Sequence, residues 1–421
     1  MERLSKHDDE LESISESLER LNSKFFLKFT DVDLTGGKRY VPMWKCVILL
    51  ELVKYLQKRN FNIQRENYCS LVEALDKMGL LEGSAIEDTL TTLDSTEFSI
   101  SLNNWITYGR HIEKTYIIKG PDKISTILMK EIAKVYLSKK KFRMIFDGMD
   151  DILRSQDFNV DIVTGLIRAA NEINNSFVNK DLNFKVIVLI RSDILDKCRD
   201  PDISKIKFAS RINLNWKIDG NPYDSELMAM VLARFNMTSK VYQDVKSMWL
   251  TYFPNEIDGK DSLQYMIENT LYKPRDVLMF FTIVQRYLNI RERRLSPEEF
   301  KIILNQYSED YFYLHMQDEL TGFLPDNAIY ELKSVISKIG SRRFSFDKFQ
   351  QELDHHQAFN GIAAEDILKL LFDRGYIGQY RKRPDHPKEE FLFQVHINPN
   401  EVFQKDDDCL VHRGLTRAFG I

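Results

Sequence analysis

The chain has 421 residues, of which 43% are hydrophobic and 29% are charged, as is usual for a globular protein of roughly two to three domains. Its formal net charge of -4 argues against a general nucleic-acid coat and against a protein of basic membrane-surface type. Four widely separated cysteines lack metal-ligand spacing, which indicates reduced thiols in a cytoplasmic protein.

The amino-terminal segment, residues 1 to about 22, is charged throughout and has no apolar core, so it is not a signal peptide. Its leucines recur near helical spacing, which predicts an amphipathic helix. Residues 25–34 (FFLKFTDVDL) are typical of a strand, and Pro42 suits the first turn of a long helix over residues 40–57. The longest apolar runs, such as residues 47–53, fall far short of the roughly 20 residues that span a bilayer, so we expect no membrane partner.

The middle of the chain predicts an α/β core. Residues from about 60 to 138 look mainly helical and form an insertion without a recognisable chemical motif. Apolar strands follow at residues 142–146 and 184–190, separated by a helix over roughly 160–175, and RINLNW (residues 211–216) is a last strand candidate. Strands separated by helices predict a parallel sheet with its chemistry at the carboxyl ends of the strands.

The second half predicts two further parts. The pattern is helical after about Asp219, and from Pro297 the elements shorten. A helix runs into a strand over residues 363–383, and a partner strand follows at residues 391–397. Helices followed by a two-stranded wing with a charged tip are the layout of a winged helix-turn-helix. We therefore expect an α/β core over residues 1–218, a helical lid over 219–296 and a winged-helix domain over 297–421.

Carboxylates follow the first core strand directly. Asp147 ends the run FRMIF, and Asp150 and Asp151 come shortly after it, with Gly148 allowing a tight turn. Mg²⁺ requires hard oxygen ligands, and a second carboxylate close by can orient or deprotonate an attacking water. A solvated turn has the same composition, because Asp and Gly are common in turns. Both interpretations stay open on this segment alone.

Polar residues also end the next strand, where VIVLI is followed by Arg191, Ser192 and Asp193. A cation at that sheet edge can contact a γ-phosphate, or it can be an ordinary surface arginine. FRMIFDGMDDI resembles the Walker B element of the STAND group of signal-transducing ATPases and of related AAA+ proteins. VIVLIRSDI resembles the strand that carries their sensor 1, RINLNW the following core strand, and YKPRDVLMFF a lid helix that carries sensor 2. LLFDRGYIGQY and CLVHRGLTRAFGI look like the winged-helix end of a bacterial P-loop ATPase group.

This resemblance implies a P-loop NTPase-like parallel core followed by a lid and a winged helix, with ATP and Mg²⁺ as cofactors. Asp147 would hold Mg²⁺ through water, and Asp150 or Asp151 would be the catalytic acid. Arg191 would be sensor 1 and Arg275 sensor 2. Arg275 has an alternative, a helix-start arginine that pairs with the neighbouring aspartate or with solvent.

The phosphate-binding loop G-x-x-x-x-G-K-[ST] does not occur in residues 1–421. Gly36-Gly37-Lys38 is followed by Arg39 and has Val32 in place of the first glycine, so we reject it as this loop. Either the chain starts at an internal methionine downstream of the loop, or it is a degenerate ATPase that keeps the fold as a scaffold. In both cases these residues should bind ATP poorly.

Three functional hypotheses follow: an ATP-dependent switch, placed in defence or stress signalling by analogy alone, a winged-helix binding module, and a scaffold without nucleotide. Arg342, Arg343 and the wing tip at residues 381–383 favour DNA as the partner, whereas the acidic total favours a protein partner or self-association. His412 and the pair at residues 355–356 lack further ligands at metal spacing, so we expect surface or capping roles for them.

Overall fold

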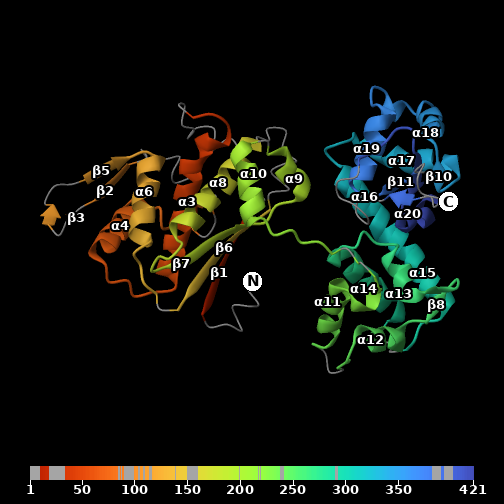
Figure 1. Ribbon diagram of the computed structural model, residues 1–421, viewed down its shortest axis with the longest axis horizontal. Coiled ribbons are helices and arrows are strands. Elements are labelled where there is room, and N and C mark those ends of the chain that lie inside the picture. Colours follow the sequence, from red (N-terminus) through yellow and green to blue (C-terminus); the bar gives the residue numbers. More distant parts are fainter. Residues whose placement is uncertain are drawn as a thin grey trace. The chain divides into compact units, whose positions relative to one another are not determined.

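The computed structural model separates the chain into two compact units, Met1–Ile212 and Asn213–Ile421 (Figure 1). Each unit has its own hydrophobic cluster, one between Ile14 and Ile203 and the other between Leu227 and Phe419. The structure describes residues 10–18, 34–83, 86, 88–89, 99–102, 105–107, 110–112, 116–137, 139–148, 160–198, 200–216, 218, 220–237, 241–289, 293–381, 390–392 and 402–421.

A parallel sheet in the order β1-β6-β7 forms the base of unit 1. Its strands are β1 (Leu11–Ser17), β6 (Lys141–Asp147) and β7 (Asn183–Val188). Ile14, Met144 and Val186 lie side by side in the register and are buried, so they share one face. The connection from β1 to β6 and the connection from β6 to β7 both move across the sheet in the same direction. Because connections between parallel strands are right-handed, the helices in both connections lie on the same face of the sheet.

The helices on that face are α3 (Val41–Lys58) and α8 (Val160–Ser176) (Figure 1). The Trp44 ring meets the Phe146 ring edge-on with 6.3 Å between centroids. Nearly all of α3 is buried, because it also packs against α6 (Pro121–Ile132). The expected long helix with Pro42 in its first turn is confirmed.

The expected amphipathic helix over residues 1–22 is wrong where the structure describes it, because Leu11–Ser17 form β1. Every residue of this strand has a partner on β6. LESISES contains three serines and one β-branched residue, which are weak helix formers, so pairing with β6 decides its structure. The strand predicted at residues 25–34 lies outside the described residues except at its last position, Leu34, which is in a bend.

The expectation of a mainly helical insertion is wrong for the described residues 99–102, 105–107, 110–112 and 116–119. Short aromatic and β-branched runs there form strands, as the propensities of these residues favour. Strand β2 pairs with β5 and strand β3 with β4, both antiparallel. The elements of the insertion are α4 (Glu66–Lys77), β2 (Ser99–Leu102), β3 (Trp105–Thr107), β4 (Arg110–Ile112), β5 (Tyr116–Lys119) and α6.

The strand predicted at residues 211–216 is also wrong. Unit 1 continues after β7 with α9 (Ser192–Lys197) and α10 (Pro201–Ser210), and the chain then runs without secondary structure. Ile212 is 85% exposed and Leu214 is 75% exposed. An alternating apolar pattern alone therefore did not make a strand of this segment.

Unit 2 is mainly helical up to residue 288, as the sequence predicted. Trp249 stacks on Phe253 with 4.0 Å between ring centroids, and Phe280 lies 5.6 Å from Phe300. This aromatic cluster therefore joins residues on both sides of position 296. The helices are α11 (Glu226–Phe235), α12 (Val245–Tyr252), α13 (Ser262–Ile267), α14 (Pro274–Leu288) and α15 (Pro297–Tyr307), with a hairpin of β8 (Glu256–Ile257) and β9 (Lys260–Asp261).

An antiparallel sheet in the order β10-β13-β11-β12 completes unit 2. The strand expected after the residue 363–373 helix is confirmed as β11. Among the described helices of both units, none combines the length and the apolar character that crossing a bilayer requires. The remaining elements are the π-helix η3 (Ser308–Phe312), α16 (Tyr313–Leu320), α17 (Asp326–Ile339), β10 (Arg343–Phe344), α18 (Phe346–Leu353), α19 (Ala364–Asp373), β11 (Ile377–Arg381), β12 (Glu390–Leu392), β13 (Asp408–Val411) and α20 (Arg413–Phe419).

Candidate functional site

The carboxyl ends of the three parallel strands meet at one edge of the sheet. On one side of the central strand, Leu18 N donates to Asp147 O over 2.8 Å, and on the other side Leu189 N donates to Phe146 O over 2.8 Å. The Asp147 side chain is exposed, and its Oδ1 accepts a hydrogen bond from Gly148 N (2.8 Å). Gly148 has a φ of +84°, which glycine adopts without strain. The central strand, which is hydrogen-bonded on both sides, therefore ends in an exposed carboxylate.

Arg191 lies beyond the end of β7, at the same edge of the sheet. Phe146 is opposite Val188 in the register, and Arg191 is the N-cap residue of α9. The predicted placement of Asp147 and Arg191 at one edge therefore agrees with the register. Asp150 and Asp151 lie outside the described residues, and the assigned roles of all four residues stay predictions.

Gly37, from the glycine pair that we rejected as a phosphate-binding loop, has a packing role. Gly37 belongs to the 3-10 turn η1 (Gly36–Tyr40), which lies against α8. A Cβ atom on Gly37 would lie 2.4 Å from Thr164 Cγ2, and one on Gly165 would lie 2.7 Å from Tyr40 Cβ. The turn η1 and the helix α8 approach so closely that a side chain at Gly37 or at Gly165 would force them apart.

Arg275 is exposed in the first turn of α14, and its neighbour Asp276 is buried. The Asp276 carboxylate accepts hydrogen bonds from Leu271 N (2.9 Å) and from Tyr311 OH (2.8 Å). No ion pair joins Asp276 to Arg275, so the suggested pairing is wrong. Two interpretations of Arg275 stay open: an arginine that faces solvent, and the predicted sensor 2. The aspartate has a structural role, because it ties the turn before α14 to η3.

A partly buried network around Glu319 was not predicted. Lys273 Nζ lies 3.1 Å from one carboxylate oxygen, and Tyr376 OH donates to the other over 3.0 Å. His315 Nδ1 is hydrogen-bonded to Tyr376 OH (2.9 Å), and Arg374 Nη1 lies 4.0 Å from Glu319 Oε2. Burial acts to raise the pKa of Glu319, but the charge of Lys273 and the hydrogen bond from Tyr376 hold it below its usual value.

Two motifs from distant parts of the sequence meet at this acid. Lys273 comes from YKPRD, whereas Arg374 and Tyr376 come from DRGYI. Only a weak signal of this network is present in the sequence. The spacing of His315 and Glu319 by four residues places both on one helix face, but it does not show that this face is partly covered by other elements. The network holds α14, α16 and α19 together, so we assign it to the stability of unit 2.

His412 is a helix cap, as expected. Its Nδ1 accepts a hydrogen bond from Gly414 N (3.0 Å) at the start of α20, and its ring stacks on Phe312 with 5.2 Å between centroids. Throughout the described residues, no group of three histidine, cysteine, aspartate or glutamate side chains is arranged to hold a metal ion.

One family model covers the first part of unit 2. Residues 225–313 match the FunZ-associated C-terminal helical domain. The matched segment begins at Ser225, the N-cap residue of α11, and ends at Tyr313, the first residue of α16. It contains the exposed Arg275 and the buried Asp276.

Most of the chain is similar to a curated protein named putative transposon gamma-delta 80.3 kDa protein, from Escherichia coli (strain K12). The two are 18% identical over 390 residues, which cover 88% of this chain and 52% of the relative. The chain thus spans about half the length of the curated relative that it matches. No solved structure is significantly similar to it. Neither match names a P-loop ATPase, so that resemblance stays a prediction.

Proposed function

We propose that this chain is the greater part of an ATP-dependent switch, in which unit 1 supplies the Mg²⁺ end of a nucleotide site. The main support is the exposed carboxylate of Asp147 at the end of the central parallel strand, beside the segment that leads to Arg191. Mg²⁺ in nucleotide sites is bound by one or two carboxylates together with substrate phosphates and waters. Ligands bind outside the carboxyl ends of the strands in open α/β sheets.

A switch requires contacts that differ between two states. A γ-phosphate with its Mg²⁺ beside Asp147 and Arg191 would be present before hydrolysis and lost after it, as in other nucleotide switches. The phosphate-binding loop would come from a segment outside residues 1–421. Unit 2, with its proposed lid and winged helix, would transmit the state to a partner.

The test compares two proteins. One consists of residues 1–421, and the other also carries the residues encoded directly upstream of them in the gene. We expect weak binding of Mg²⁺-ATP by residues 1–421 and tight binding with hydrolysis by the extended form. In that form Asp147→Asn should weaken the apparent Mg²⁺ affinity by about 10- to 100-fold. Calorimetric titration measures the binding of Mg²⁺-ATP, and phosphate release at increasing Mg²⁺ concentrations measures hydrolysis and the apparent Mg²⁺ affinity.

Asp181→Asn is the matched control, since this exposed aspartate precedes β7 at the opposite edge of the sheet. Equal Mg²⁺ affinities for the two variants would remove the nucleotide site from this edge. The scaffold hypothesis would then replace the switch.

A second candidate is a winged-helix binding module. The order of α17, β10, α18, α19 and the β11-β12 hairpin supports this layout. Arg381 Nε lies 2.6 Å from Asp407 and Arg343 Nη2 lies 2.7 Å from Asp408, so carboxylates already engage two of the arginines expected to bind DNA. We therefore favour a protein partner. Binding of duplex DNA that weakens steeply with added salt would favour DNA instead.

A further inference from the structure

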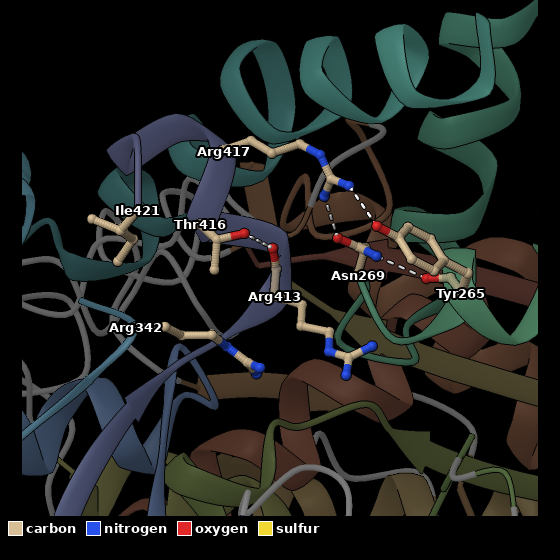
Figure 2. A pocket seen from close by; sticks show the side chains of 7 residues that line it. All are labelled: Tyr265, Asn269, Arg342, Arg413, Thr416, Arg417 and Ile421. Carbon is tan, nitrogen blue, oxygen red and sulfur yellow. Dashed lines mark hydrogen bonds between the residues drawn. The ribbon is translucent and has the colours of Figure 1, made fainter. Parts of the chain in front are cut away.

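A pocket of about 460 Å³ in unit 2 is lined by three arginines (Figure 2). Arg342 precedes β10, whereas Arg413 and Arg417 belong to α20. Figure 2 shows the Arg342 and Arg413 side chains directed into the same hollow. Tyr265 of α13 and Asn269, just after that helix, form the opposite wall, so the lining comes from three distant parts of the sequence.

Positive charge exceeds negative charge in this pocket. Arg413 forms an ion pair with Glu268, which Lys260 also contacts. Arg417 has neutral partners, Asn269 Oδ1 at 2.9 Å and Tyr265 OH at 3.1 Å. The three lining arginines and Lys260 face one glutamate, so these side chains leave positive charge in excess.

Arg342 is the least satisfied of these cations. Its Nε donates to Val411 O over 2.8 Å. Within the part of the chain that the structure describes, its two terminal nitrogens have no hydrogen-bond or ion-pair partner. Burial and the charge of Arg413 lower the pKa of Arg342 to about 10, so the side chain still carries its charge at neutral pH. A desolvated cation without a carboxylate partner destabilises the folded protein, and such groups concentrate at functional sites.

We propose that this pocket binds the dianionic phosphate of a phosphomonoester. The excess of positive charge favours a dianion over a phosphodiester or a carboxylate, each of which carries a single negative charge. The planar guanidinium group presents a fork of donors that fits phosphate oxygens in pairs. Arg417 is already oriented by its two neutral partners, so little ordering is needed on binding. The phosphate belongs either to a small free molecule or to the phosphorylated end of a nucleic acid.

The first experiment titrates the whole chain with inorganic phosphate and with a nucleoside monophosphate in a calorimeter. We expect Arg342→Gln to weaken binding of both probes by about 10- to 100-fold, because a charged hydrogen-bond donor is lost. Arg234→Gln is the matched control, since Arg234 is an exposed arginine of α11 that does not line the pocket. Equal affinities in the two variants, or no binding of either probe to the native chain, would overturn the proposal.

A second arm separates the two sources of the phosphate. It compares one oligonucleotide with a 5′-phosphate and with a 5′-hydroxyl group. Tighter binding of the phosphorylated form that Arg342→Gln abolishes indicates a nucleic-acid end, and tight binding of the monophosphate alone indicates a small molecule. If both oligonucleotides bind equally well and Arg342→Gln weakens the binding of both, the pocket recognises phosphodiesters. That result would contradict the proposal.

A third measurement separates ligand binding from a purely structural role of Arg342. Without ligand, Arg342→Gln should unfold at the same temperature as the native chain or higher, because the substitution removes a desolvated charge beside Arg413. Phosphate should raise the unfolding temperature of the native chain and not of the variant. A lower unfolding temperature together with an unchanged phosphate effect would assign Arg342 to stability alone.

Discussion

At the residue scale, the start of α15 shows how one carboxylate can have several local partners. Ser296 Oγ accepts a hydrogen bond from Glu299 N (3.2 Å), and Glu299 Oε2 accepts one from Ser296 N (3.0 Å), which is a capping box. Arg293 Nη1 donates to the same carboxylate oxygen over 2.7 Å. The hydrogen bond from Arg293, with that from Ser296, lowers the pKa of Glu299 to about 2.

Glu299→Gln should therefore change how stability depends on pH. The folded pKa of about 2 lies below the usual value of 4.5, so the carboxylate stabilises the fold above pH 4.5 and this contribution is lost as the pH falls toward 2. We expect the variant to be less stable at pH 7 and to lose less stability on acidification. Urea unfolding at several pH values measures both.

Glu226→Gln, in the first turn of α11, is the control for this measurement, since Glu226 is exposed at a similar helix start. It should keep the native dependence on pH. A Glu299→Gln variant with that same dependence would show that the capping box and its ion pair do not act in solution.

At the element scale, unit 1 depends on the close approach of η1 to α8. Besides Thr164, a Cβ on Gly37 would meet the Asp161 carbonyl oxygen at 3.1 Å, so backbone as well as side-chain atoms stand in its way. The helix α8 in turn packs on β7 and on α3. A displacement of η1 would therefore disturb the layer that supports the sheet edge with Asp147.

Gly37→Ala should destabilise unit 1 by about 1–3 kcal/mol, the usual cost of overpacking a tightly packed site. Unit 2 is the internal control, because its hydrophobic cluster contains no residue of unit 1. Thermal unfolding followed by calorimetry should show one transition lowered and the other unchanged. An unfolding profile like that of the native chain would mean that η1 moves away at little cost.

At the scale of the whole molecule, the two units have separate cores and an exposed connection. Residues 211–216 have no secondary structure, and Arg211 is exposed within them. Lys207, in contrast, lies in α10, and its Nζ is 3.2 Å from Asp196 Oδ1. Separate cores predict that each unit folds without the other.

Limited digestion with trypsin should cleave after Arg211 before it cleaves after Lys207, and mass spectrometry should find a fragment that begins at Ile212. This fragment should still unfold cooperatively in urea. Arg211→Gln should abolish the fragment, which controls for cleavage elsewhere. Cleavage after Lys207 as fast as after Arg211 would indicate that α10 does not protect the end of unit 1.

Local sequence determined the elements whose own residues favour one structure strongly. The apolar runs predicted β6 and β7, the length and composition of residues 40–57 predicted α3, and the helical period predicted the first part of unit 2. The edge that carries Asp147 could also be predicted, because the carboxyl ends of parallel strands meet at one edge.

Only the tertiary structure decided the rest. Residues 11–17 have apolar side chains at helical spacing, yet they form a strand because β6 pairs with every one of them. Residues 211–216 alternate as a strand would, yet they have no secondary structure. The Glu319 network and the arginine pocket combine side chains that lie far apart in the chain. Periodicity reports only on neighbours along the sequence, whereas burial and charge in a pocket depend on contacts that form after the helices have packed.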